Sequence, residues 1–141
     1  MQKSFTFEQV SKAEVWKIAP EDTNYFAILF DPANSPTKNI YLIEIFTKDG
    51  ATPPNSHSEA HEFFYVIAGE GTASSDGDTL NISKGDAILL EPGSVHIIEN
   101  TGEGKLYTLT VMTPNQEFSE LIRSGYKVEL DDEDKRVLLG A

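Results

Sequence analysis

Short apolar runs separated by turn residues dominate the middle of this chain. Several are rich in the aromatic and β-branched residues that favour strands. Runs of this kind cover residues 25–30, 40–46, 63–68, 72–75, 79–82, 87–90, 95–99 and 106–112. The segment around Trp16 predicts a further strand at an edge of the sheet. Short strands at this spacing, broken by glycine and proline, are typical of a sandwich or a barrel, so the pattern predicts an all-β fold.

Two of these runs carry a sharper signal. Asp76-Gly77 lies between the predicted strands over 72–75 and 79–82, and an Asp-Gly pair in that place predicts a tight hairpin turn. The run 106–112 alternates strictly, with bulky apolar side chains on one face and Thr108 and Thr110 on the other. Both features indicate antiparallel strands.

Helix signals come only late in the chain. Asn115 predicts the start of a helix over 116–123, and Gly125 is typical of the residue that ends one. The acidic run 131–134 predicts the start of a second short helix that ends near Gly140. We expect this acidic run to be solvated and not to act as a docking site.

Length, charge and cysteine content narrow the class of protein. The chain has 141 residues, which suggests one domain, and a net charge of -12 with a pI near 4.5. This charge repels phosphate backbones and anionic lipids, so we expect no nucleic-acid or membrane partner. There is no cysteine, which excludes thiol chemistry and cysteine-ligated zinc. No stretch has the length of a transmembrane helix or the pattern of a signal peptide, and we expect a cytoplasmic protein.

Two segments about thirty residues apart hold the residues that point to chemistry. Asn55 and His57 are two positions apart, so in an extended strand both side chains would point to the same side. Glu62 lies at the start of an apolar run, which is an unusual place for a carboxylate unless charge is needed there. His96 begins another apolar run, and a barrel would bring these strands together.

Two imidazoles and one carboxylate form a facial triad, a ligand set that leaves coordination positions open for water, dioxygen or a chelating substrate. Imidazole suits Fe, Mn, Zn, Ni and Cu, so the residues leave the metal open. The side-chain oxygen of Asn55 is a weak, neutral candidate for a fourth ligand. Each histidine alone is explained as well by an ordinary polar residue at the end of a strand.

The two segments together resemble the paired signature motifs of the cupin superfamily, which are small β-barrels of the jelly-roll type. In the first motif four residues separate His57 from Glu62, and six separate Glu62 from Gly69. In the second, the matching positions are Gly85, Gly93, His96 and Asn100, with Glu91 where a proline is usual. The resemblance covers about 50–100 and implies that His57, Glu62 and His96 are ligands of one divalent metal ion inside the barrel.

One position departs from the family pattern. Asn55 lies where the family usually has its first histidine, which leaves the fourth ligand and the metal open. A register with His57 as the first histidine and Glu59 as its partner leaves only two residues before Glu62, which is too few. We therefore prefer the register that begins at Asn55. His61 is turned to the opposite face by strand alternation.

The resemblance implies a double-stranded β-helix, or jelly-roll barrel, with one or two short C-terminal helices. We expect one cupin domain over 1–141, with a barrel core over about 25–113 and a helical tail over about 114–141. Side chains two or four positions after a candidate ligand on the same strand point to the same face as that ligand. We therefore predict that Phe64 and Val66, counted from Glu62, and Ile98, counted from His96, line the pocket. The same parity leaves an apolar outer face that needs a cover, which predicts a homodimer or an overlying terminal segment.

Three functions fit this site. We favour a metal-dependent enzyme that acts on a small molecule, of dioxygenase, isomerase, decarboxylase or lyase type, with oxygenase chemistry slightly preferred. The first alternative is a non-catalytic module that binds or senses a small ligand, which the missing first histidine favours. The second is a metal-free isomerase or epimerase that uses a histidine as general base with Glu62 beside it.

Overall fold

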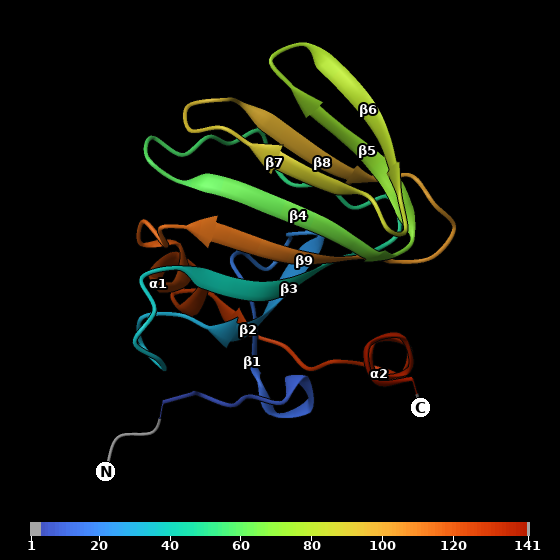
Figure 1. Ribbon diagram of the computed structural model, residues 1–141. Coiled ribbons are helices and arrows are strands. Elements are labelled where there is room, and N and C mark those ends of the chain that lie inside the picture. Colours follow the sequence, from blue (N-terminus) through green and yellow to red (C-terminus); the bar gives the residue numbers. More distant parts are fainter. Residues whose placement is uncertain (1–3, 141) are drawn as a thin grey trace.

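Two antiparallel sheets make up most of the structure, a computed structural model that describes residues 4–140 (Figure 1). The larger sheet has the order β10-β1-β2-β3-β9-β4-β7 and the smaller one the order β6-β5-β8. The strands are β1 (Glu14–Lys17), β2 (Asn24–Phe30), β3 (Ile40–Phe46), β4 (His61–Ala68), β5 (Glu70–Ser75), β6 (Asp78–Ser83), β7 (Ala87–Leu90), β8 (His96–Asn100), β9 (Leu106–Thr113) and β10 (Tyr126–Lys127). The helices are the 3-10 turn η1 (Val10–Lys12), α1 (Phe118–Arg123) and α2 (Asp132–Leu139).

The inner faces of the two sheets share an apolar core. Phe46, Phe64 and Leu106 of the larger sheet pack with Ile82 and Ile98 of the smaller one, and all five are buried. A second cluster around Phe26, Leu42 and Met112 continues along the inner face of the larger sheet, where Ile122 of α1 closes it. The predicted all-β jelly-roll fold with two short helices is confirmed.

Most of the predicted strands form within one or two residues of the expected bounds. The predicted hairpin forms at Asp76 and Gly77, whose φ angles of 48° and 92° are in the left-handed region that a tight turn of this kind requires. The helix predicted over 116–123 begins later, at Phe118, because Gln116 and Glu117 also have positive φ. Strand β1 forms as predicted but does not lie at the edge of the sheet, because the short strand β10 pairs with it.

The segment that carries Asn55 and His57 is not a regular strand. It runs alongside β8 and is joined to that strand by two isolated β-bridges, one between Ala51 and Glu99 and one between Asn55 and His96. Pro53 and Pro54 lie between these bridges, and proline has no N–H to donate to a ladder. The prediction of an extended strand for these two side chains was therefore wrong in detail, although both line the same cavity.

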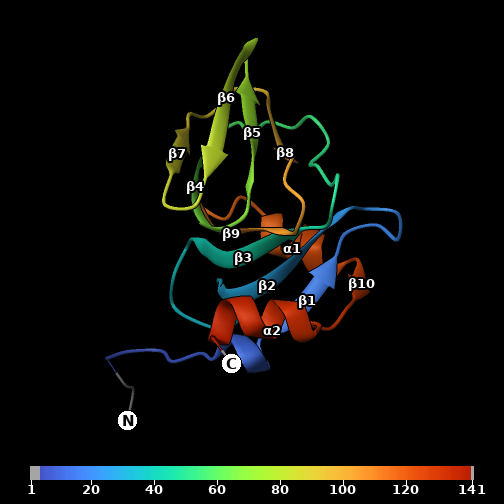
Figure 2. The same ribbon diagram turned by 90° about the vertical axis from the view of Figure 1, so that its right-hand side faces the viewer.

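The acidic run at the start of α2 is only partly exposed. Asp131 caps the helix and accepts from the N–H of Asp134, but Asp134 itself is completely buried. Its carboxylate accepts hydrogen bonds from Tyr25 (2.6 Å), Tyr107 (2.7 Å) and Lys105 (3.0 Å). The expectation of a solvated run was wrong at this position, because α2 packs on the outer face of the larger sheet (Figure 2) and Asp134 binds Tyr25 and Tyr107 of that sheet.

None of the helices in residues 4–140 has the length and apolar character needed to cross a membrane.

Candidate metal centre and ligand cavity

A cavity of about 460 Å³ opens at one end of the barrel. Its wall is formed by the inner faces of β2, β3, β4 and β8, by the 52–57 segment and by α1. His57, Glu62, His96 and Asn55 all reach this wall. The four predicted ligand positions therefore line one cavity.

Two imidazoles and one carboxylate converge in this cavity. Oε1 of Glu62 lies 3.2 Å from Nε2 of His57 and 2.9 Å from Nε2 of His96. One donor atom from each residue falls within 4.8 Å of the other two. Glu62 and His96 are buried and His57 is half-buried, so solvent competes little for these atoms. The arrangement fits the convergence that the motif spacing predicted.

Backbone contacts hold the loop that carries His57. Its carbonyl accepts from the N–H of Gly93 at 2.7 Å, which ties the loop to the β7–β8 turn. Gln116 holds the following residues, because its Oε1 accepts from the N–H groups of Glu59 and Ala60 and its Nε2 donates to Ser58. No sequence signal pointed to this role for Gln116, which depends on its unusual positive φ of 50°.

His96 and Asn55 are fixed together. Their backbones exchange both hydrogen bonds, at 2.9 and 3.2 Å. Nδ1 of His96 lies 3.4 Å from the carbonyl of Ser94, which leaves Nε2 to face the cavity. Nδ2 of Asn55 donates to the carbonyl of Pro53, so its Oδ1 points away from that contact.

Two side-chain oxygens in this cluster have no hydrogen-bond partner among the described residues. They are Oδ1 of Asn55 and Oε1 of Glu62, and both atoms are buried. Oε1 nevertheless lies within ion-pair distance of both imidazoles, 3.2 Å from Nε2 of His57 and 2.9 Å from Nε2 of His96. A buried oxygen without a partner is costly, and these two belong to two of the four predicted ligands.

The donor set and its spacing suit a metal ion. Ligands about 2.1 Å from an octahedral ion and at right angles to one another lie about 3.0 Å apart. The two measured separations from Glu62, 2.9 and 3.2 Å, are close to that value. Two nitrogens and one carboxylate oxygen are ligands that first-row transition metals accept. An ion bound here would be held by His57, Glu62 and His96, with the free Asn55 oxygen available.

Glu62 is suited to remain ionised despite its burial. Burial alone would raise the pKa of its carboxyl group, but the neighbouring His57 and His96 favour the charged form and lower the pKa below its usual range. A buried carboxylate that stays charged is the form that a cation requires.

A second carboxyl group lies on the same wall, and it was not among the predicted site residues. Glu44 of β3 is only 3% exposed and lines the cavity. Its Oε2 accepts from Nδ2 of Asn24 at 2.9 Å, and its Oε1 accepts from Oγ1 of Thr110 at 3.3 Å. Burial and the nearby Glu62 raise the pKa of Glu44 to about 8. Its signal was visible, since it is a lone carboxylate inside the apolar run 40–46.

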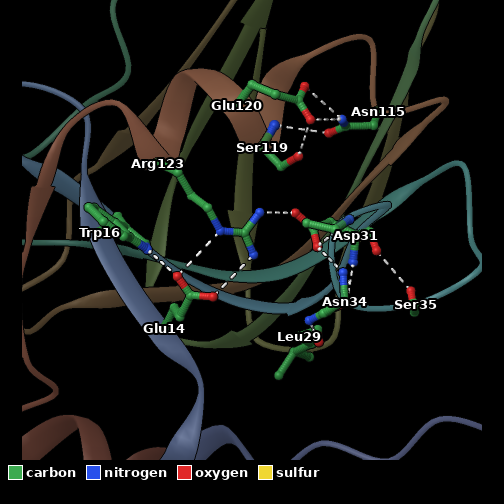
Figure 3. A network of polar contacts seen from close by, with 11 residues as sticks. Glu14, Trp16, Leu29, Asp31, Asn34, Ser35, Asn115, Ser119, Glu120 and Arg123 are labelled. Atoms are coloured by element: carbon green, nitrogen blue, oxygen red, sulfur yellow. Dashed lines mark hydrogen bonds and ion pairs between the residues drawn. The ribbon is translucent and has the colours of Figure 1, made fainter.

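Helix α1 lies against this cavity and is fixed from behind by a polar network (Figure 3). Arg123 at its end pairs with Asp31 after β2 and with both carboxylate oxygens of Glu14 on β1. At its start, Oδ1 of Asn115 accepts from the N–H of Ser119. These contacts place Phe118 in the cavity wall, where its ring meets that of His57 at 5.9 Å between centroids.

The remaining predicted side chains are distributed unevenly. Phe64 lines the cavity, whereas Val66 and Ile98 pack in the core between the two sheets and do not reach it. They point inward as parity requires, but they lie further along the barrel, where the space is filled. His61 is exposed and pairs with Glu91 at 3.1 Å. Asn100 binds only backbone, donating to the carbonyls of Phe46, Thr47 and Gly104.

Comparison with known proteins gives one family match. Residues 42–112, half of the chain, match the family model described as the Cupin domain. An uncharacterized protein from Methanocaldococcus jannaschii, MJ1618, is 29% identical over 113 residues, which are 75% of this chain and 88% of that protein. The oxalate-binding protein of Thermotoga maritima is 35% identical over 66 residues, which are 43% of this chain and 54% of that protein.

A solved structure shares the fold over most of the chain. The crystal structure of a predicted oxalate decarboxylase from Thermotoga maritima superposes with a TM-score of 0.68 at 22% identity. The match covers 76% of this chain and 97% of that one. At this identity the similarity establishes a common fold and leaves the ligand to be argued from the site itself.

Proposed function

This chain belongs to the Cupin domain family, and on that premise we propose that it is a metal-dependent enzyme acting on a small molecule in the barrel. His57, Glu62 and His96 would hold one divalent ion, and the Asn55 oxygen would complete or tune its coordination. The observation that carries this proposal is the convergence of three donor atoms, with a partnerless carboxylate oxygen among them, in a cavity large enough for a ligand.

A bound divalent ion would act as a Lewis acid or bind dioxygen, depending on the metal. The residues of this chain would do the rest. Three protein ligands would leave coordination positions for a substrate oxygen. The apolar side chains of Phe26, Phe64 and Phe118 would exclude water from the reacting atoms. Fe, Mn, Zn, Ni and Cu all accept this donor set.

Metal titration of protein first stripped with a chelator tests the proposal. Wild-type protein should take up close to one equivalent, and metal at a hundred times its Kd should raise the free energy of unfolding by about 2.7 kcal/mol. His96→Ala should lose this stabilisation. The matched control is His61→Ala, which removes an exposed histidine outside the cavity and should leave metal uptake unchanged. Equal losses in the two variants, or no uptake of any of the five metals by the wild type, would reject the metal site.

A metal-free acid–base function is the second candidate, because one observation favours it. The Glu62 carboxylate lies within 3.2 Å of both imidazoles, so it could orient either one as a general base. Turnover that persists in chelator-treated protein and disappears in His96→Ala would support this candidate against the first. Stabilisation by a ligand without turnover would instead support a binding or sensing module.

We also propose that the outer face of the larger sheet pairs with a second copy of the chain. Helix α2 and the strands beside it cover one half of this face, including the half-buried Ile67 and Leu109. On the other half Tyr65 is 41% exposed, and Leu89 of β7, which lies opposite Phe63, is 59% exposed. Adjacent exposed apolar side chains of this kind are typical of an interface. The mass in solution, measured by light scattering, tests a homodimer directly.

The substrate class is a separate question. One relative is named as an oxalate-binding protein, which makes a small dicarboxylate one candidate ligand for this cavity. The size, walls and charge of the cavity give independent evidence on that candidate.

A further inference from the structure

The cavity is much larger than a two-carbon dicarboxylate needs. Its volume of about 460 Å³ lies within the range of about 300–1,000 Å³ found for sites of larger organic ligands. A ligand as small as oxalate would contact the metal ligands and leave most of the wall to water. The volume therefore indicates a ligand with a substantial body.

Most of the exposed surface of this wall is apolar, and aromatic and aliphatic side chains contribute to it. Phe26 and Phe64 are almost fully buried, and Phe118 and Leu121 of α1 line the same cavity together with Ile18. Phe26 and Phe118 already meet edge to face, with centroids 5.7 Å apart. Surfaces of this kind gain free energy by covering an apolar or aromatic body.

The charges on the wall are of one sign. Four carboxyl groups line the cavity, those of Asp22, Glu44, Glu62 and Glu117, and no lysine or arginine does so among the residues that the structure describes. Specific sites for carboxylates usually supply a cation or a bidentate arginine. Here a bound divalent ion would be the one strong positive charge, and Glu62 already neutralises part of it. An anionic ligand would lose its hydration without gaining a protein counter-charge.

Glu44 adds a polar contact of a different kind. Asn24 and Thr110 hold its carboxyl group at the wall from the β2 and β9 sides, and Thr108 stabilises the same patch through Thr110 at 2.9 Å. The pKa of about 8 leaves Glu44 mostly protonated at neutral pH, where a carboxylic acid can donate a hydrogen bond as well as accept one. Hydroxyl and keto oxygens suit such a group.

We propose that the cavity selects an uncharged molecule with an apolar or aromatic body, whose hydroxyl or keto oxygen hydrogen-bonds Glu44, and rejects small carboxylates. The proposal takes the candidate metal cavity as the ligand site and so rests on the proposed function for its location. Its basis is the size, wall and charge of the cavity, and none of these requires a bound ion. Glu44 is assigned as a residue that determines specificity.

Two matched probes isolate the effect of charge. 2′-Hydroxyacetophenone and salicylate have the same aromatic skeleton and the same spacing of two oxygens, but a methyl ketone in one replaces a carboxylate in the other. Calorimetry at pH 7 with metal-loaded and with chelator-stripped protein should give a Kd for the ketone at least tenfold below that for salicylate. Oxalate should bind more weakly than the ketone to both forms.

Variants of Glu44 test whether its side chain hydrogen-bonds the ligand. Glu44→Leu should weaken the binding of the ketone at least tenfold, because it removes the hydrogen bond at the wall. Glu44→Gln keeps a hydrogen-bonding group of the same shape, and the affinity should stay within about threefold of the wild type. Circular dichroism establishes that each variant is folded, and the wild-type comparison of probes does not depend on either variant.

Each outcome has one consequence. Salicylate or oxalate binding as tightly as the ketone, or no binding of the ketone at millimolar concentration, would overturn the assigned ligand class. Equal affinities in wild type and Glu44→Leu would overturn the assignment to Glu44. Metal content, measured by mass spectrometry on the same samples, reports separately on the proposed function, so a failure of metal binding is distinguished from a failure of ligand selection.

Discussion

Two buried polar clusters lie on opposite faces of the same sheet, and their hydrogen bonding differs. Under α2, Asp134 accepts from Tyr25, Tyr107 and Lys105 at 2.6–3.0 Å. In the cavity, oxygens of Glu62 and Asn55 are buried without a hydrogen-bond partner among the described residues. Since unpaired buried groups are costly, the first cluster is explained by stability and the second by a ligand that completes it.

The two clusters also differ in the parts of the chain that they connect. The network under α2 joins β2 and β9 to a helix more than a hundred residues after Tyr25, and it fastens that helix to the sheet. Burial and Asp134 raise the pKa of both tyrosine hydroxyl groups, so both remain protonated and continue to donate. The cavity cluster fastens no such element, and its donor atoms point into an open space.

The largest expected effect comes from Asp134→Ala. The substitution removes the shared acceptor of the buried Tyr25 and Tyr107 and of the half-buried Lys105, and we expect the free energy of unfolding to fall by about 3–5 kcal/mol. Urea denaturation of wild type and variant measures this difference in the free energy of unfolding. Metal uptake should stay close to that of the wild type at temperatures where the variant is folded, since the cavity does not include this network.

Asp132→Asn is the matched control for that variant. Asp132 lies in the first turn of the same helix but is exposed, and its loss should cost less than about 1 kcal/mol. If the two substitutions had similar effects, the network under α2 would not be the stabilising cluster that its hydrogen bonds indicate.

A smaller effect is expected from Glu44→Gln, and it should depend on pH. The folded-state pKa of Glu44, about 8, is above its ordinary value of 4.5, so the folded protein binds more protons than the unfolded chain between these values. Stability must therefore fall as pH rises through this window, by up to about 1.4 kcal/mol per unit. Because glutamine does not titrate, the Glu44→Gln variant should not show this loss of stability with rising pH.

Denaturation of metal-free protein at pH 5 and pH 7 measures this difference. Relative to the wild type, Glu44→Gln should gain about 2–3 kcal/mol between the two pH values. Glu62 titrates in the opposite sense, because its lowered pKa gives stability that is lost only as pH falls below the ordinary carboxyl range. A parallel pH dependence in wild type and variant would show that Glu44 is ionised in the folded protein throughout.

The cavity cluster was easier to predict from the sequence than its surroundings. Local rules sufficed for the strand pattern, the hairpin at Asp76-Gly77 and the capped helix α2, because each depends on neighbouring residues. The spacing of the two motifs also placed His57, Glu62 and His96 together. Each of these signals is contained in a short stretch of the chain.

What escaped prediction depends on contacts between distant residues. The burial of Asp134 requires tyrosines from β2 and β9, and acidic runs at helix starts are usually exposed. Val66 and Ile98 have the right parity but lie where the two sheets meet, a position that strand alternation alone does not give. Glu44 was within reach, since the reason given for Glu62, a carboxylate in an apolar run, applies to it equally.

The smallest expected effect concerns Asn55, whose free oxygen is a weak candidate ligand. Asn55→Ala removes a buried oxygen that has no partner in the described part of the chain, so the metal-free protein should lose little stability, less than about 0.5 kcal/mol. If Oδ1 binds the ion, the same change should weaken metal affinity by about tenfold, which corresponds to about 1.4 kcal/mol.

Asn55→His is the informative counterpart of that variant, because it restores the residue that is usual at this position of the motif. Imidazole is a stronger ligand than an amide oxygen for first-row transition metals, so affinity should rise by about tenfold relative to the wild type. A rise with histidine and a fall with alanine, both measured by competition with a chelator, would place position 55 at the metal. Unchanged affinity in both variants would leave the ion with three protein ligands and would exclude the Asn55 oxygen from its coordination.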